Sequence, residues 1–238
     1  MNQAKSNVDP RELAKFKALA NHWWNPQGPL KALHDINPLR LDYIDRRAPL
    51  NGARILDVGC GGGLLSEAMA RRGARVLGID LAQESLDVAI AHAEEAGVQV
   101  DYRCVAVEQL AADQPGTFEI VTCLEMLEHV PVPARAVAAC ALAVQPGGSV
   151  FFSTINRNLK SFLMAIVGAE HVLGMLPKGT HEYEKLIRPS ELASWCRNSG
   201  LQVLDVTGMH FNPLTGSFRL GGNVDVNYFV EAQRGIRS

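Results

Sequence analysis

Short apolar runs alternate with amphipathic stretches through the middle of this chain of 238 residues. Runs rich in β-branched and aliphatic residues predict strands near 53–58, 75–79, 98–104, 118–123 and 148–154. Apolar residues at helical spacing fill the gaps, near 63–72, 83–96 and 131–144. Strands separated by helices are typical of parallel βαβ units. The pattern therefore predicts an α/β fold with a doubly wound, mostly parallel sheet.

The two flanks of this alternating region follow different patterns. Asp9-Pro10 is a cap and first-turn pair for a helix from Arg11 to about Trp24, and a second helix is expected from about Pro38 to Arg47. On the other side, a helix is expected near 189–199 and strands near 201–208 and 224–231. These two strands bring the expected sheet to seven.

A long apolar stretch follows the fifth predicted strand. Between Ser161 and Leu176 only Glu170 and His171 interrupt the apolar pattern. In isolation it would fit a core helix, but its place in an insertion favours a lid. We expect one domain in four parts: an N-terminal helical cap (1–50), a cofactor-binding core (51–156), an apolar lid insertion (157–188) and a C-terminal helix with strands (189–238).

The first predicted strand runs directly into a glycine-rich turn, Asp57-Val58-Gly59-Cys60-Gly61-Gly62-Gly63. Glycines let the backbone turn sharply and let a ligand approach where a Cβ would block it. The free N–H groups at the following helix start favour a polar or anionic ligand group. Asp57 is placed to hold a cationic group, and Asp80 ends the next strand nineteen residues after Gly61. That spacing is close to the roughly 20 residues typical of a ribose-binding acid.

The glycine spacing separates two classes of cofactor. A dinucleotide turn needs G-x-G-x-x-G, but the third position here is Leu64 and the glycine comes one residue early. An NAD site and a glycine turn without ligand are the weaker alternatives. The D-x-G-x-G-x-G pattern resembles the first motif of S-adenosylmethionine-dependent methyltransferases. The resemblance implies that Gly59, Gly61 and Gly63 surround the methionine end of the cofactor and that Asp80 holds its ribose.

Two further segments fall at the carboxyl ends of predicted strands, where open α/β sheets bind ligands. In methyltransferases of this class the segment after the third strand grips adenine, which would place Ala106 and Val107 at the adenine wall. A plain strand-to-loop transition explains those two residues equally well. After the fourth strand comes Glu125-Met126-Leu127-Glu128-His129. His129 or Glu128 could take a proton from a hydroxyl acceptor, and together with Glu125 they could bind a divalent cation, whereas a solvent-facing charged loop is the alternative.

Composition narrows the class of protein. A net charge of −2 and a pI near 6.4 argue against a nucleic-acid-binding protein. Five scattered cysteines without a C-x-x-C pair indicate buried free thiols and a reducing compartment. The N-terminus shows no apolar signal-peptide core, and no uncharged apolar run reaches the roughly 18 residues of a membrane span. We therefore expect a cytoplasmic protein.

Several longer segments carry a closer resemblance, namely E-M-L-E-H-V-P at 125–131, F-F-S-T-I-N-R-N at 151–158, M-A-I-V-G-A-E at 164–170, P-K-G-T-H at 177–181 and V-D-V-N-Y at 224–228. Together with Trp23-Trp24 and Asn37-Pro38-Leu39-Arg40 they cover almost the whole chain. They resemble the ubiquinone-biosynthesis O-methyltransferase family. The resemblance implies methylation of 2-polyprenyl-6-hydroxyphenol and 3-demethylubiquinol, and cofactor contacts at Arg40 and Leu124.

The same resemblance extends to metal, membrane and partners. Related eukaryotic members imply a magnesium ion at Glu125, Glu128 and His129. The apolar stretch at about 159–178, with basic flanks such as Arg157, would let the protein contact anionic lipid at the inner face of the membrane. Other ubiquinone-biosynthesis proteins are expected partners. The alternatives are methylation of a soluble catechol or other small molecule, and a cofactor- or lipid-binding protein without catalysis.

Overall fold

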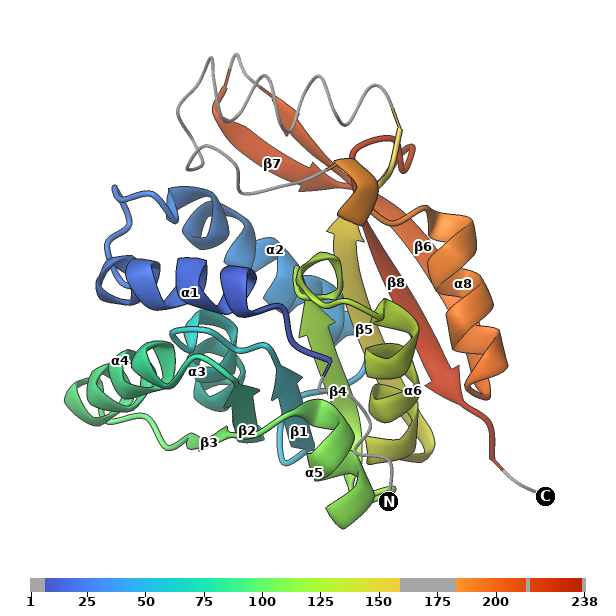
Figure 1. The fold of residues 1–238 in the computed structure, drawn as a ribbon, viewed down its shortest axis with the longest axis horizontal. Helices are drawn as coiled ribbons and strands as arrows, with labels where there is room; N and C mark the ends of the chain where they lie inside the picture. The colour runs from blue at the N-terminus through green and yellow to red at the C-terminus, as the bar shows by residue number, and fades with distance from the viewer. Residues whose placement is uncertain (1–6, 159–182, 213–214, 237–238) are drawn as a thin grey trace.

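The computed structural model describes residues 7–158, 183–212 and 215–236. Their strands form a single sheet of eight in the order β3-β2-β1-β4-β5-β8-β6-β7 (Figure 1). The parallel half contains β1 (Arg54–Val58), β2 (Arg75–Asp80), β3 (Asp101–Cys104), β4 (Phe118–Leu124) and β5 (Val144–Ile155). The antiparallel half adds β6 (Leu201–Asn212), β7 (Ser217–Leu220) and β8 (Asn227–Arg234). The expected fold class is confirmed.

The eighth strand is the one the sequence pattern missed. β7 has only four residues, Ser-Phe-Arg-Leu, and pairs with the outer end of β6, where Met209 faces Leu220 and Asn212 faces Ser217. So short a strand carries little periodicity of its own. β6 and β7 extend past the other strands as a hairpin, so the expected count of seven was one strand too low.

The α-helices lie near the expected ranges, with two exceptions, and the short 3-10 turns η2 and η4 were not expected. In chain order they are α1 (Pro10–Leu19), η1 (Ala20–His22), α2 (Lys31–Arg47), α3 (Leu64–Arg71), α4 (Gln83–Glu95), α5 (Val107–Asp113), η2 (Leu127–His129), α6 (Pro133–Ala143), η4 (Tyr183–Lys185) and α8 (Pro189–Asn198). α2 begins at Lys31 and carries Pro38 inside it, so the expected start at Pro38 was wrong. Packing of Leu33 and Ile36 against the core explains the extra turns. The short helix α5 was not expected at all.

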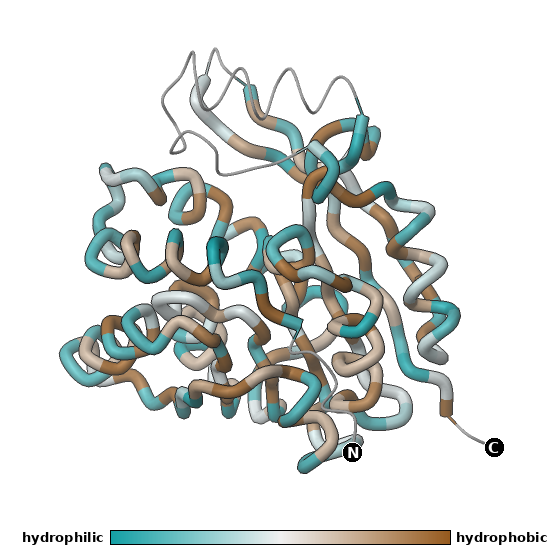
Figure 2. Tube along the Cα trace, viewed as in Figure 1, coloured by the Kyte–Doolittle hydropathy of each residue, from teal (hydrophilic) through white to brown (hydrophobic). Residues whose placement is uncertain are grey.

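The sheet separates two hydrophobic cores, because alternate strand residues face opposite sides. On β5, Val150 and Phe152 face a core shared with α5, α6 and α8, whereas Phe151 faces the core shared with α2 and α3. Figure 2 shows the apolar positions concentrated along the central strands. The central strands are covered on both faces, which explains their nearly continuous apolar sequences.

The carboxyl ends of the parallel strands meet under the N-terminal helices. The sheet order reverses between β1 and β4, and ligands bind outside the strand ends at such a switch point. α1 and α2 lie across this edge (Figure 1). The fold therefore predicts a site between the strand ends and the N-terminal cap.

The structure bears on the expected burial of the cysteines and on the expected lack of a membrane-spanning segment. Cys60, Cys123, Cys140 and Cys196 are buried free thiols, but Cys104 is exposed because it ends the edge strand β3. In the described parts of the chain, no helix has the length and apolar character needed to cross a bilayer. The apolar stretch at about 159–178 lies outside the described residues.

Candidate active site

A cavity of about 660 Å³ lies at the strand ends and under the N-terminal helices. It is large enough for a nucleoside cofactor together with part of a second ligand. Ten of the expected site residues line it: Arg40, Asp57, Gly59, Gly61, Asp80, Ala106, Val107, Leu124, Glu125 and His129. Gly63 and Glu128 stand behind its wall. One cavity thus joins the glycine turn to the acid–histidine loop.

The glycine turn has no room for side chains. Gly59, Gly61 and Gly63 have φ values of 71°, 53° and 85°, a region that other residues rarely adopt. A Cβ on Gly61 would lie 2.2 Å from the ring of Trp23, and one on Gly63 would lie 2.2 Å from the hydroxyl oxygen of Tyr102. The backbone of the turn is therefore fixed between aromatic side chains on two sides.

Asp80 holds the turn from the neighbouring strand. Its Oδ2 accepts a hydrogen bond from Gly61 N at 2.9 Å, and its Oδ1 accepts one from Ala82 N at 2.8 Å. Burial raises the pKa of Asp80, while the backbone donors oppose that rise. The carboxylate lines the cavity beside the turn, which is the position the spacing predicted for a ribose-binding acid.

Asp57 is more enclosed than its sequence position suggested. Ser66 Oγ donates to Asp57 Oδ2 at 2.6 Å, and Thr122 Oγ1 donates to Oδ1 at 2.7 Å. Burial raises its pKa against these two hydroxyl donors. Both oxygens thus tie β1 to α3 and β4. Asp57 also lines the cavity, and the nearby positive charge of Arg40 opposes the rise of its pKa.

Arg40 brings a buried cation to the cavity from α2. Its Nη2 lies 3.0 Å from Glu125 Oε1, yet neither Nη2 nor Nε has an aligned hydrogen-bond acceptor. Burial lowers the pKa of Arg40, and Glu125 opposes the change. A buried guanidinium with unused donors is costly without a ligand. Its donors suit a carboxylate such as that of the methionine end of S-adenosylmethionine.

Glu125 is held in an unusual backbone conformation at the end of β4. Its φ is 52°, and it is the one non-glycine residue with positive φ among those described. Ser153 Oγ donates to Glu125 Oε1 at 2.7 Å. Such strain persists only where surrounding contacts over-determine it, and it occurs often at functional sites. Here the contacts with Arg40 and Ser153 hold Glu125 beside the cavity.

Glu128 points away from the cavity into the protein. It is 2% exposed and its Oε2 accepts a hydrogen bond from Thr154 Oγ1 at 2.9 Å, while Oε1 has no partner. Burial, aided by the charge of Glu125, raises the pKa of Glu128 to about 7. Glu128 is therefore not among the residues that line the cavity. The neighbours Glu128 and His129 lie on opposite sides of the cavity wall.

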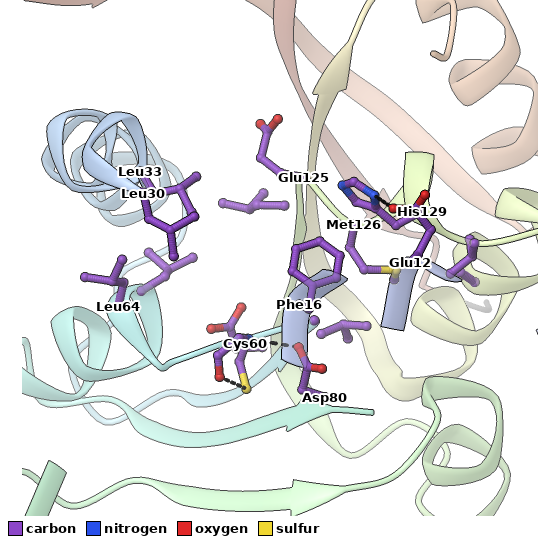
Figure 3. A pocket seen from close by; sticks show the side chains of 18 of the residues that line it. Glu12, Phe16, Leu30, Leu33, Cys60, Leu64, Asp80, Glu125, Met126 and His129 are labelled. Carbon is purple, nitrogen blue, oxygen red and sulfur yellow. Dashed lines mark hydrogen bonds and ion pairs between the residues drawn. The ribbon is translucent and has the colours of Figure 1, made fainter. Parts of the chain in front are cut away.

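His129 faces the cavity and is held by the N-terminal helix. Its Nδ1 lies 2.8 Å from Glu12 Oε2, and the ring of Phe16 meets it edge-on at a centroid distance of 4.9 Å (Figure 3). The Lys15 and Lys185 ammonium groups lie 3.1 Å and 3.0 Å from Glu12 Oε1. The His129 hydrogen bond, assisted by these lysines, holds the pKa of Glu12 well below its ordinary value.

This arrangement does not suit a metal ion. Glu125 faces Arg40 and Ser153, Glu128 faces Thr154, and His129 faces Glu12. Across the described ranges, no group of three or more His, Cys, Asp or Glu side chains could hold a metal ion. The three residues expected to bind magnesium are therefore each engaged with a different partner.

Some residues in and around the cavity were not found from the sequence. Glu12 lies 117 positions before its partner His129, and no local motif links them. Trp23 covers the glycine turn, and Trp24 donates to Gly62 O at 2.9 Å and stacks on His92. From the sequence, covering the pocket and packing the helices were competing interpretations for these tryptophans. Trp23 lines the cavity and Trp24 packs the cap.

Comparison with known sequences identifies the family. Residues 32–206 match the family model described as "Methyltransferase domain". A ubiquinone biosynthesis O-methyltransferase of Paracidovorax citrulli (strain AAC00-1) is 60% identical over 235 residues, covering 98% of this chain and 99% of the relative. The proteins of that name from Pseudomonas aeruginosa (strain UCBPP-PA14) and Burkholderia pseudomallei (strain K96243) are each 57% identical, covering 96% and 97% of this chain and 99% of each relative.

Solved structures agree on the fold. Magnesium protoporphyrin IX methyltransferase from Synechocystis PCC 6803, with bound SAH, matches with a TM-score of 0.66 at 18% identity, and the match covers 96% of both chains. A SAM-dependent methyltransferase from Thermotoga maritima matches with a TM-score of 0.67 at 14% identity, covering 92% of this chain and 98% of the other. Sequence identity, fold and cavity agree: the chain belongs to the ubiquinone biosynthesis O-methyltransferase family.

Proposed function

We propose that this protein methylates phenolic hydroxyl groups of the polyprenylated intermediates 2-polyprenyl-6-hydroxyphenol and 3-demethylubiquinol. Membership of the family supports S-adenosylmethionine-dependent O-methylation in ubiquinone biosynthesis. The observation that carries the proposal is the single cavity that holds both the glycine turn with Asp80 and the imidazole of His129. A methyl donor and a hydroxyl acceptor could meet there.

Four residues would hold the cofactor. The backbone of Gly59 and Gly61, which lines the cavity, would face its methionine end, Asp80 would accept from its ribose hydroxyls, and the unused donors of Arg40 would meet its carboxylate. Ala106, Val107 and Leu124 supply apolar wall at the adenine side and the strand end. When bound, S-adenosylmethionine supplies an electrophilic methyl group on a sulfonium.

His129 is the residue placed to take the acceptor's proton. A phenol with a pKa near 10 is ionised to only about one part in a thousand at neutral pH. A base in contact with the hydroxyl overcomes that deficit, and general-base catalysis contributes about 10²–10⁴-fold. Of the two expected bases, Glu128 stands behind the wall and His129 lines the cavity. Glu128 would support the loop from behind.

The acceptor end of the cavity is apolar. Its apolar lining includes Ile155 at the end of β5, three residues of the β6–β7 hairpin (Met209, Phe211 and Phe218), and Val226 directly before β8. A benzene ring and the first isoprene units of a tail would bury apolar surface there. A soluble, untailed catechol would use little of this wall, so the wall favours a prenylated acceptor.

The apolar stretch at about 159–178 is the proposed contact with anionic lipid at the inner face of the membrane. Its composition is that of an interfacial segment, with Arg157 and Lys178 at its flanks. Flotation with vesicles containing anionic lipid should carry wild type more than the Phe162→Glu/Ile166→Glu variant. Equal and negligible flotation of both proteins would remove this part of the proposal.

A methyl-transfer assay on short-chain prenylated catechols tests the activity, with and without chelator. We expect transfer to the ring oxygen that depends on prenyl chain length and that chelator leaves unchanged, because the three acidic and histidine residues face separate partners. His129→Ala should lower kcat about 10²–10⁴-fold while the affinity for S-adenosylhomocysteine changes little. Transfer indifferent to chain length would favour a soluble acceptor. Cofactor binding without any transfer would favour a non-catalytic protein.

A further inference from the structure

We propose that Glu12 is the positioning residue of the methyl-transfer reaction: its carboxylate fixes both the orientation of the His129 ring and the ring nitrogen that faces the acceptor. The inference rests on the proposed function, in which His129 takes the acceptor's proton. Glu12 belongs to α1, outside the segment that matches the methyltransferase-domain model.

The contacts around His129 fix the ring from two directions. Glu12 Oε2 lies 2.8 Å from Nδ1, and Glu12 itself is only 4% exposed. Phe16, one turn further along α1, meets the imidazole at an interplanar angle of 88°. A hydrogen bond in the ring plane and an aromatic edge contact together restrict rotation of the imidazole.

The partners of Glu12 determine which ring nitrogen is basic. Lys15 and Lys185 hold Glu12 Oε1 in its ionised form, and an ionised carboxylate can only accept hydrogen bonds. The hydrogen between Glu12 and His129 therefore belongs to Nδ1. In a neutral imidazole the lone pair is then on Nε2. Figure 3 shows Glu12 on the side of the ring away from Glu125, so Nε2 is the nitrogen directed across the cavity.

The same carboxylate stabilises the product of proton transfer. When Nε2 takes the hydroxyl proton, the ring becomes a cation whose Nδ1–H already donates to an anion. His129 has a side chain only 11% exposed, so solvent offers little replacement for this interaction. Removing the charge of Glu12 should therefore slow proton transfer, whereas substrate and cofactor contacts stay in place.

A purely structural role for Glu12, docking α1 onto the core, predicts something different. Loss of docking would weaken cofactor binding and would slow every acceptor equally. Loss of positioning would affect only acceptors that need a base. The chain offers a matched control in Glu84 of α4. Its Oε1 lies 3.0 Å from the ammonium group of Lys17, so it also pairs with a residue of α1, but it makes no contact with His129.

The test compares two acceptors in wild type, Glu12→Gln, Glu12→Asp, Glu84→Gln and His129→Ala. One is a short-chain prenylated catechol; the other is its nitro derivative, whose hydroxyl is already ionised at the assay pH. We expect Glu12→Gln to lower kcat on the first about tenfold to a hundredfold, with little change in KM. On the second, Glu12→Gln should match wild type. Glu12→Asp should recover part of the rate, and Glu84→Gln should behave as wild type on both.

A second measurement does not depend on turnover. In protein with ¹⁵N-labelled histidine, two-bond ¹H–¹⁵N spectra distinguish the two neutral tautomers, and the His129→Ala spectrum identifies the His129 signals. Wild type and Glu84→Gln should show His129 protonated at Nδ1, and Glu12→Gln should show a mixture of tautomers. An unchanged tautomer in Glu12→Gln would overturn the inference.

The proposed base and the positioning role of Glu12 can be disproved separately. If His129→Ala keeps normal turnover on the prenylated catechol, the proposed base is wrong and the inference falls with it. If His129→Ala is slow but Glu12→Gln is normal, the base stands and the positioning role is wrong. Equal slowing of both acceptors by Glu12→Gln would also overturn positioning and assign Glu12 to docking of α1.

Discussion

The two ends of the cavity are built in opposite ways. At the cofactor end, Gly59, Gly61 and Asp80 lie within about 20 residues of one another, on one βαβ unit whose backbone sets their places. At the acceptor end, His129 depends on Glu12 of the N-terminal helix, and Glu125 depends on Arg40. Apart from Arg40 and Trp23, which the N-terminal segment supplies, the first end follows from local sequence. The second exists only when distant segments have packed together.

This contrast explains why the two ends should respond differently to mutation. A backbone site tolerates no added atoms, because its neighbours are fixed rings and main chain. A site assembled from side chains tolerates changes in shape more easily but is sensitive to lost charge and hydrogen-bond partners. Three substitutions test that difference.

The largest effect is expected from Gly61→Ala at the cofactor end. The new Cβ would lie 2.2 Å from the ring of Trp23, at a residue whose φ is 53°. Calorimetry should show at least about a hundredfold weaker binding of S-adenosylhomocysteine, or about 2.7 kcal/mol. Gly97→Ala is the matched control, since its φ is 64° but nothing lies within 4 Å of a Cβ there. Equal losses in both variants would show that backbone strain alone, and not the closed turn, explains the effect.

An intermediate effect is expected from Glu128→Gln, through stability. The pKa of Glu128 is about 7 in the folded protein against an ordinary 4.5, so the folded state binds more protons between these values. Stability therefore falls as pH rises through this interval, by about 2 kcal/mol between pH 5 and pH 8. Urea unfolding at pH 5 and pH 8 should show this loss in wild type, and Glu128→Gln should lack most of it. A wild-type midpoint that rises with pH over this interval would contradict the burial argument.

The smallest effect is expected from Trp23→Phe. The change keeps a ring over the glycine turn but removes the hydrogen bond from Trp23 Nε1 to Ser85 Oγ, 3.2 Å long, at a cost of about 1 kcal/mol. Titration with S-adenosylhomocysteine should change the tryptophan fluorescence of wild type and of Trp195→Phe. The change should be much smaller in Trp23→Phe. An undiminished change would mean that Trp23 only packs the cap.

Most of the fold could be predicted because its strands and helices have clear periodicity. The glycine turn and Asp80 were predictable for the same reason, since their chemistry lies in one stretch of sequence. The missed elements were those with short or misleading patterns. β7 has four residues, and α2 carries Pro38 in its interior, where proline more often marks a helix start.

The acid–histidine loop could be located from sequence but not resolved. Residues 125–129 were correctly placed at a strand end, yet the 3-10 turn η2 directs Glu128 inward and leaves His129 in the cavity wall. No spacing rule predicts which of the two side chains points into the protein. That depends on their partners, Thr154 for Glu128 and Glu12 for His129. The different positions of Glu128 and His129 therefore follow from long-range packing and not from the local sequence.

The position of α1 has a consequence for recombining this chain with its relatives. Because Glu12 and Phe16 precede residue 32, where the methyltransferase-domain match starts, a chimaera joined at that boundary would take its cofactor turn from one parent and the support of its histidine from the other. Crossovers placed before Asp9 would keep the two together. The segment to exchange as one unit thus begins at the N-terminal helix α1, before the start of the matched methyltransferase domain.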